Sequence, residues 1–203
     1  ADLRGLSFHR GDPGSILECL ASDVGATAIY WNRRYYSSAI TQDTNVKERL
    51  TKAGLTVKTF KGTVLNEPRE ILTGNGTPYK VFTAYWKAAR KNPISFPLPS
   101  PTVTLAQHSY DRDPPVDWGL VSTALNWTDT WTDQWQPGEA SAGDRLSEFI
   151  DKDLETYGRD RDRPDLSATS RLSPHLHFGE ISPRQIITTI NFHVDQEPTL
   201  ASS

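Results

Sequence analysis

The sequence predicts an α/β domain built on a parallel sheet, followed by a long linker and the start of an all-helical domain. Strand and helix signals alternate through the first ninety residues, which is typical of a parallel sheet with right-handed crossovers. From Pro137 onward the sequence carries helical patterns and no strand signal. We therefore expect an α/β domain at residues 1–92, a linker at 93–136 and a helical domain at 137–203.

The α/β part begins with a short strand candidate at residues 6–9. A helix follows, because Asp12 is a suitable N-cap, Pro13 suits the first helical position and Gly25 can close the last turn. The remaining predicted elements are a buried strand at 26–31, a helix at 43–54, a strand at 55–60 and an aromatic-rich helix at 79–92.

The predicted linker is rich in proline, tryptophan and threonine and shows little periodicity. We expect its tryptophans to anchor it against the domains, since nothing around them suggests stacking on bases. These residues are Trp118, Trp127, Trp131 and Trp135.

The helical part opens with an amphipathic helix whose apolar side chains form one stripe, and Gly158 is expected to end it. The stripe consists of Leu146, Phe149, Ile150, Leu154 and Tyr157.

Bulk composition excludes several classes of protein. The single cysteine, Cys19, rules out an internal disulfide and thiolate metal sites. No apolar window approaches the ~18 residues of a membrane span, and no signal peptide is evident, so a cytoplasmic location is expected. The net charge of −3 means that any nucleic-acid surface must be local.

The absence of methionine and the abrupt ends suggest an internal piece of a longer protein with both domains incomplete.

Two Ser-Pro pairs stand nine residues apart, Ser173-Pro174 and Ser182-Pro183. Each serine is a natural N-cap with proline at the first helical position, and Gly179 would end the first helix. Helix starts also attract anions, and Thr169, Ser170 and Arg171 add donors beside the first pair. Capping alone and an anion site both remain open from the residues themselves.

No side chains suggest catalysis. His175 and His177 are two residues apart and point to different sides of a helix, so no metal site is expected. The sequence has no nucleophile elbow, P-loop or glycine-rich dinucleotide motif. We therefore predict no catalytic residue here and expect a cofactor to supply the chemistry.

The stretch "TSRLSPHLHFGEISPRQ" at residues 169–185 closely resembles the flavin-binding signature of the DNA photolyase/cryptochrome family. Two further stretches, "GTPYKVFTAYWKA" at 76–88 and "WNRRY" at 31–35, are similar to segments of the family's antenna domain.

The resemblance implies a Rossmann-like antenna domain, a long linker and a helical domain that holds FAD. It places the FAD-binding residues at Tyr157, Thr169, Ser170, Arg171, Leu172 and Ser173. It also implies that Arg161 contacts the DNA backbone.

The likeness is to a class I-type cyclobutane pyrimidine dimer photolyase, an enzyme that uses light and FAD to repair UV-damaged DNA. A monomer without metal or membrane partners is implied. One alternative is a cryptochrome, a blue-light receptor that signals without repair. Another is an unrelated α/β protein whose Ser-Pro pairs only cap helices.

The sequence departs from the family in two respects. Folate-binding members carry an acidic residue where this sequence has Ser38-Ala39, so a folate antenna is in doubt and the second chromophore stays unidentified. The lesion-binding residues, the tryptophan electron-transfer chain and most of the flavin pocket would follow Ser203. A molecule ending there is expected to bind no FAD stably and to repair nothing.

Overall fold

The computed structural model describes residues 6–102, 118–119 and 135–196. These residues form two compact units, each described by itself below. The first comprises residues 6–60 with 100–102 and 118–119, and the second comprises residues 61–99 with 135–196. The predicted domain division after residues 92 and 136 stays a prediction.

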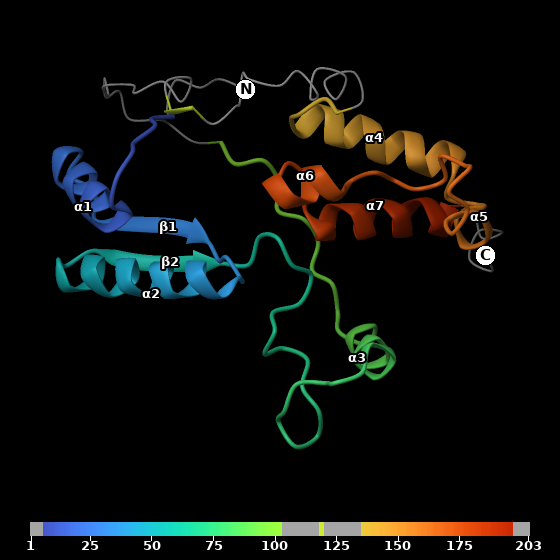
Figure 1. Cartoon of the computed structure of the whole chain (residues 1–203), viewed down its shortest axis with the longest axis horizontal. Coiled ribbons are helices and arrows are strands. Elements are labelled where there is room, and N and C mark those ends of the chain that lie inside the picture. The colour runs from blue at the N-terminus through green and yellow to red at the C-terminus, as the bar shows by residue number, and fades with distance from the viewer. Residues whose placement is uncertain (1–5, 103–117, 120–134, 197–203) are drawn as a thin grey trace. The chain divides into compact units, whose positions relative to one another are not determined.

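The first unit is a parallel α/β structure. It contains helix α1 (Pro13–Asp23), strand β1 (Ala28–Asn32), helix α2 (Ser37–Lys52) and strand β2 (Thr56–Phe60). The two strands lie side by side and point the same way (Figure 1), with Ala28 paired to Thr56 and Asn32 to Phe60. Helix α2 packs on β2 and on α1. The predicted parallel α/β arrangement is confirmed for these elements.

Helix α1 begins and ends where its local signals predict. The Asp12 carboxylate accepts a hydrogen bond from the Ser15 N–H at 2.8 Å, and Pro13 occupies the first turn. Gly25 follows the helix with φ +63°, a left-handed conformation that glycine adopts without a steric penalty.

Two predictions in this unit are wrong. Residues 6–9 form no strand, because a strand needs a hydrogen-bonded neighbour and none lies beside them in the described chain. Helix α2 begins at Ser37 rather than at residue 43, since the polar side chains of its first turns are compatible with a helix. The Thr41 and Thr44 hydroxyls donate to carbonyls one turn earlier, at 3.2 and 2.7 Å.

The predicted linker is described only in part. Trp118 lies edge-on to Phe8, with ring centroids 6.4 Å apart, as expected of an anchoring aromatic. Trp135 is half-buried, and Trp127 and Trp131 lie outside the described residues.

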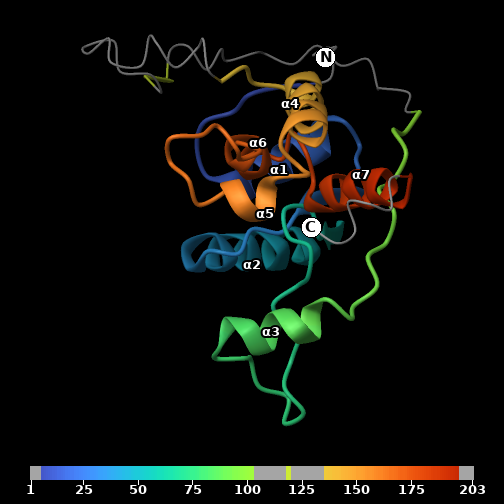
Figure 2. The same cartoon turned by 90° about the vertical axis from the view of Figure 1, so that its right-hand side faces the viewer.

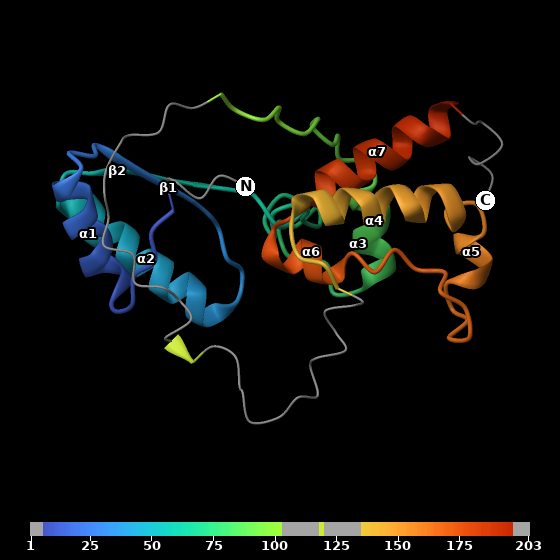
Figure 3. The ribbon, with the colours of Figure 1, turned by 90° about the horizontal axis from the view of Figure 1, so that it is seen from above.

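The second unit is helical in its described part. Residues 61–99 contain helix α3 (Phe82–Ala89), which is shorter than the predicted 79–92. Residues 135–196 contain α4 (Glu139–Lys152), α5 (Tyr157–Asp160), α6 (Ser173–Phe178) and α7 (Pro183–Gln196), and no strand. Helix α4 packs against α7, as seen from above in Figure 3, while α5 and α6 lie beside α4 (Figure 2).

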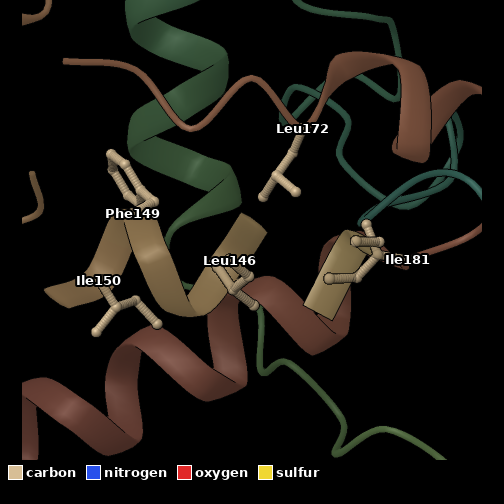
Figure 4. Packing of buried hydrophobic residues seen from close by; sticks show 6 residues of the cluster. Leu146, Phe149, Ile150, Leu172 and Ile181 are labelled. Carbon is tan, nitrogen blue, oxygen red and sulfur yellow. The ribbon is translucent and has the colours of Figure 1, made fainter. Parts of the chain in front are cut away.

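The core of this unit forms between α4 and the residues around α6 and α7 (Figure 4). Its buried members are Ala142, Leu146, Phe149, Ile150, Leu172 and Ile181. Burying one leucine or isoleucine side chain contributes about 1.5–3 kcal/mol, so this cluster fixes the positions of the loops that enter it.

The predicted apolar stripe is only partly one helix. Helix α4 ends at Lys152, and Tyr157 starts a separate short helix, so the expected end at Gly158 is wrong. The chain turns after Lys152, where the N–H groups of Asp153 and Leu154 both donate to the Phe149 carbonyl. The Tyr157 and Phe149 rings nevertheless pack edge-to-face, with their centroids 5.4 Å apart, so these two members of the predicted stripe remain in contact.

Candidate flavin phosphate loop

Residues 168–173, which we call the hydroxyl loop, lead into helix α6. Ala168 and Leu172 are buried at 5% and 2% exposure. Thr169, Arg171 and Ser173 are exposed. Leu172 therefore anchors the loop in the helical core and Ala168 is buried at its start, while Thr169 and Arg171 between them are exposed.

Arg171 gives the loop its sharp bend. Its φ of +51° makes it the one residue other than glycine with positive φ among those the structure describes. This left-handed conformation is unfavourable for a residue with a side chain and is typically held in place by its surroundings. The bend turns the chain so that Leu172 reaches the core while Arg171 remains in solvent.

The loop carries donors that the described protein does not use. The hydroxyls of Thr169, Ser170 and Ser173 take part in no hydrogen bond within the described part of the chain. The peptide N–H groups of residues 169–173 likewise donate to no described acceptor. Free hydroxyl and N–H donors beside an exposed guanidinium suit a phosphate.

Ser173 does not cap helix α6, which corrects the sequence prediction. The cap position is Leu172, Ser173 is already helical, and no side-chain cap bond forms. Ser182 does act as predicted before α7. Its hydroxyl accepts from the Gln185 N–H at 3.1 Å, while the Gln185 side chain accepts from the Ser182 N–H at 2.8 Å.

A hollow of about 410 Å³ lies beside the loop, against α4 and α5. Thr169 and Ser170 line it. So do charged residues that sequence reasoning missed: Arg145, Glu148, Lys152, Asp153 and Asp160. The spacing of Arg145, Glu148 and Lys152 by three and four residues on one helix was the available signal.

The charges around Glu148 are paired. Its carboxylate lies 2.9 Å from the Lys152 ammonium and 3.4 Å from the Arg145 guanidinium. The hydrogen bond from Lys152 lowers the pKa of Glu148, and Arg145 and the nearby Arg171 lower it further. Arg171 is thus the cation that links the loop to this cluster.

Asp160 is a buried carboxylate at the base of the hollow, with 6% exposure. Arg159 donates two hydrogen bonds to it, at 2.8 and 2.7 Å. These bonds, with help from the Thr156 hydroxyl, lower the pKa of Asp160 to about 2. The group therefore stays ionised at neutral pH and is unsuited to act as a general acid.

Tyr157 begins α5, and Arg161 directly follows its last residue. The Arg161 guanidinium lies 5.8 Å from the centre of the Tyr157 ring, and its side chain is 53% exposed. Neither residue lines the hollow with Thr169 and Ser170. The Leu172 side chain points into the core, so only its backbone is available to a ligand.

No helix among the described residues is long and apolar enough to cross a membrane. Within the same ranges, no group of three or more His, Cys, Asp or Glu side chains is arranged to hold a metal ion.

Comparison with known proteins shows the family to which the chain belongs. Residues 3–103 match the family model described as DNA photolyase. The chain is 39% identical over 183 residues to a deoxyribodipyrimidine photo-lyase of Agrobacterium fabrum, covering 89% of this chain and 38% of that protein. This chain belongs to the DNA photolyase/cryptochrome family.

The family's two named branches are both represented. Cryptochrome-2 of Arabidopsis thaliana is 35% identical over 178 residues, covering 85% of this chain and 29% of that protein. A solved bacterial class III photolyase from Agrobacterium tumefaciens superposes with a TM-score of 0.82 at 39% identity, over 87% of this chain and 37% of that one. The sequence suggested a class I-type likeness, whereas this solved relative is described as class III. The chain spans less than two-fifths of each of these three proteins.

Proposed function

We propose that this chain supplies part of the antenna domain and one wall of the FAD pocket of a light-dependent DNA repair enzyme. The reaction is the splitting of UV-induced cyclobutane pyrimidine dimers, a carbon–carbon lyase reaction. The observation that carries the proposal is the hydroxyl loop, whose free donors occur within the "TSRLSP" signature. The named photo-lyase relatives support it.

The residues present fit the cofactor's phosphates. Thr169, Ser170 and Ser173 would donate hydroxyls and N–H groups to phosphate oxygens, and Arg171 would balance their charge. Leu172 would contribute its backbone, and Tyr157 would pack beside the cofactor. When bound, reduced FAD excited by light supplies the electron that splits the dimer. The chain's own residues bind and orient, since no described group is placed for acid or base catalysis.

Damaged DNA is the proposed substrate. Arg161 is our candidate for a contact to the DNA backbone, because its guanidinium is exposed and its ion pair with Asp162, at 3.6 Å, is weak. A phosphate could therefore replace Asp162 as its partner at little cost. We expect the protein to act as a monomer and to be cytoplasmic, and the identity of a second chromophore is left open.

A cryptochrome function is the second candidate. It is favoured by the 35% identity to a plant cryptochrome over most of this chain. Both candidates need the FAD loop, so the hydroxyl loop does not separate them.

The test uses the full-length protein. We expect visible flavin absorption after purification and light-dependent repair of an oligonucleotide that contains a thymine dimer. Bound, reduced flavin without repair would favour the cryptochrome. No flavin binding under any condition would contradict both.

A further inference from the structure

One buried histidine and one glutamate tie the end of helix α6 to the start of helix α4. The His175 side chain is 5% exposed, and its Nδ1 lies 2.6 Å from Oε2 of Glu180. The other carboxylate oxygen, Oε1, accepts the Gly138 N–H at 2.8 Å. Both oxygens of Glu180 therefore have a partner, and we call these three residues the His175–Glu180–Gly138 clamp.

The clamp joins parts of the chain that are 42 residues apart. Gly138 immediately precedes α4, and Glu180 lies between α6 and α7. Gly179, with φ +74°, ends α6 in a left-handed turn that brings the Glu180 N–H to the His175 carbonyl at 2.9 Å. Charge-assisted bonds of this kind are among the stronger and more directional contacts in a protein.

The clamp acts on the hydroxyl loop through a short rigid connection. His175 follows Ser173 by two residues within the same helix. Leu172 and Leu176 pack that helix against the core, but apolar packing is not directional and leaves the helix some freedom of orientation. The directional bond at His175 removes this freedom, so the N–H and hydroxyl groups of residues 169–173 keep one orientation.

Glu180 is kept ionised for this role. The hydrogen bond with His175 lowers its pKa, and the Gly138 N–H lowers it further.

We propose that His175 and Glu180 are positioning residues that set the hydroxyl loop for the diphosphate of FAD without touching the cofactor. This inference rests on the proposed function, because it assumes that the loop binds the FAD phosphates. It predicts that breaking the clamp lowers affinity for flavins that carry the diphosphate and spares flavins that lack it.

The test measures binding of FAD and of riboflavin to flavin-free full-length protein by fluorescence, alongside its thermal unfolding. Glu180→Ala removes both bonds of the clamp, and we expect FAD affinity to fall about tenfold with riboflavin affinity changed less than twofold. Glu180→Gln keeps an amide oxygen to accept the Gly138 N–H and an amide group to hydrogen-bond with His175 Nδ1, so it is expected to keep FAD affinity within twofold of the wild type.

Ser182→Ala is the matched control, because it removes a helix cap two residues from Glu180 and leaves the clamp intact. It should lower the melting temperature without changing FAD affinity. If Glu180→Ala does not fold, His175→Phe takes its place, since it keeps an aromatic ring at this position and leaves the Glu180–Gly138 bond in place.

The outcomes separate the two proposals. Wild-type protein that binds no FAD contradicts the proposed function, and the positioning role falls with it. Wild-type binding with unchanged FAD affinity in the variants contradicts the positioning role alone. An equal loss of FAD and riboflavin affinity, or an equal loss in Ser182→Ala, also overturns it and shows that the clamp only stabilises the fold.

Discussion

The two Ser-Pro pairs share a dipeptide and differ in what their serines do. Ser182 closes a reciprocal pair of hydrogen bonds with Gln185, whereas Ser173 is already helical and makes no such bond. The residue three positions after each serine accounts for this difference. After Ser182 it is Gln185, whose side chain accepts a hydrogen bond from the Ser182 N–H, whereas after Ser173 it is Leu176, which packs against the core. The comparison teaches that the same dipeptide can leave its serine with a structural partner or without one, and we expect only the hydroxyl without a partner, that of Ser173, to bind a ligand.

The largest effect on stability is expected from removing the Leu172 side chain, which anchors the chain just before Ser173-Pro174 in the core. Leu172→Ala deletes a fully buried side chain and should lower the free energy of unfolding by about 3 kcal/mol, from lost burial and the cavity left behind. Urea denaturation of flavin-free protein measures it. Leu166→Ala, at a 40% exposed position before the same loop, is the control and should cost less than ~0.5 kcal/mol. Equal losses would mean that the loop is not anchored at Leu172.

The comparison of the two serines can be tested directly. Ser182→Ala should lower the free energy of unfolding by about 1 kcal/mol, because it removes a working cap. Ser173→Ala should change stability by less than ~0.5 kcal/mol and weaken FAD binding, since its hydroxyl has no structural partner. Urea denaturation and flavin titration of both variants measure this. A stability loss in Ser173→Ala as large as in Ser182→Ala would break the distinction.

Substitutions of Arg171 in the hydroxyl loop separate the effect of its left-handed backbone conformation from the effect of its charge. Arg171→Gly removes the steric cost of the left-handed conformation but raises the conformational entropy of the unfolded chain. These effects oppose each other, so the free energy of unfolding should change by no more than about 1 kcal/mol. FAD affinity should fall, because the cation is lost. Arg171→Lys keeps the charge and the strain, and it should retain most of the affinity. Thermal unfolding and flavin titration measure both properties, and unchanged affinity in Arg171→Gly would remove Arg171 from the site.

The smallest expected effect is the contribution of Asp160 to folding stability at low pH. The pKa of Asp160 is lowered from 3.8 to about 2, so its contribution to folding is complete above 3.8 and is lost as the pH falls towards 2. The difference in melting temperature between wild type and Asp160→Asn should therefore shrink across this interval. Thermal melts of flavin-free protein from pH 5 to pH 2 measure it. A difference that stays constant would show that Arg159 does not stabilise the ionised carboxylate.

The sequence by itself determined the elements whose signals lie within a few residues. The Asp12-Pro13 start and Gly25 end bound α1, strand and helix alternation predicted the parallel pair of β1 and β2, and Ser182 with Pro183 marked the start of α7. Such signals are readable because caps and turns are satisfied by neighbours along the chain. The "TSRLSP" stretch also identified the family, which the matches to photolyases and cryptochromes confirm, while its role as the flavin loop stays a prediction.

Only the tertiary structure decided the features that depend on distant partners. Residues 6–9 are no strand because no neighbouring strand accompanies them in the described chain. The hydrogen bond from Gly138 to Glu180 joins residues 42 positions apart, which the packing of the helical core brings together. Hydrogen bonds between residues so far apart produce no periodic pattern in the sequence. The physical reason is that the two partners come within bonding distance only after the helices have packed.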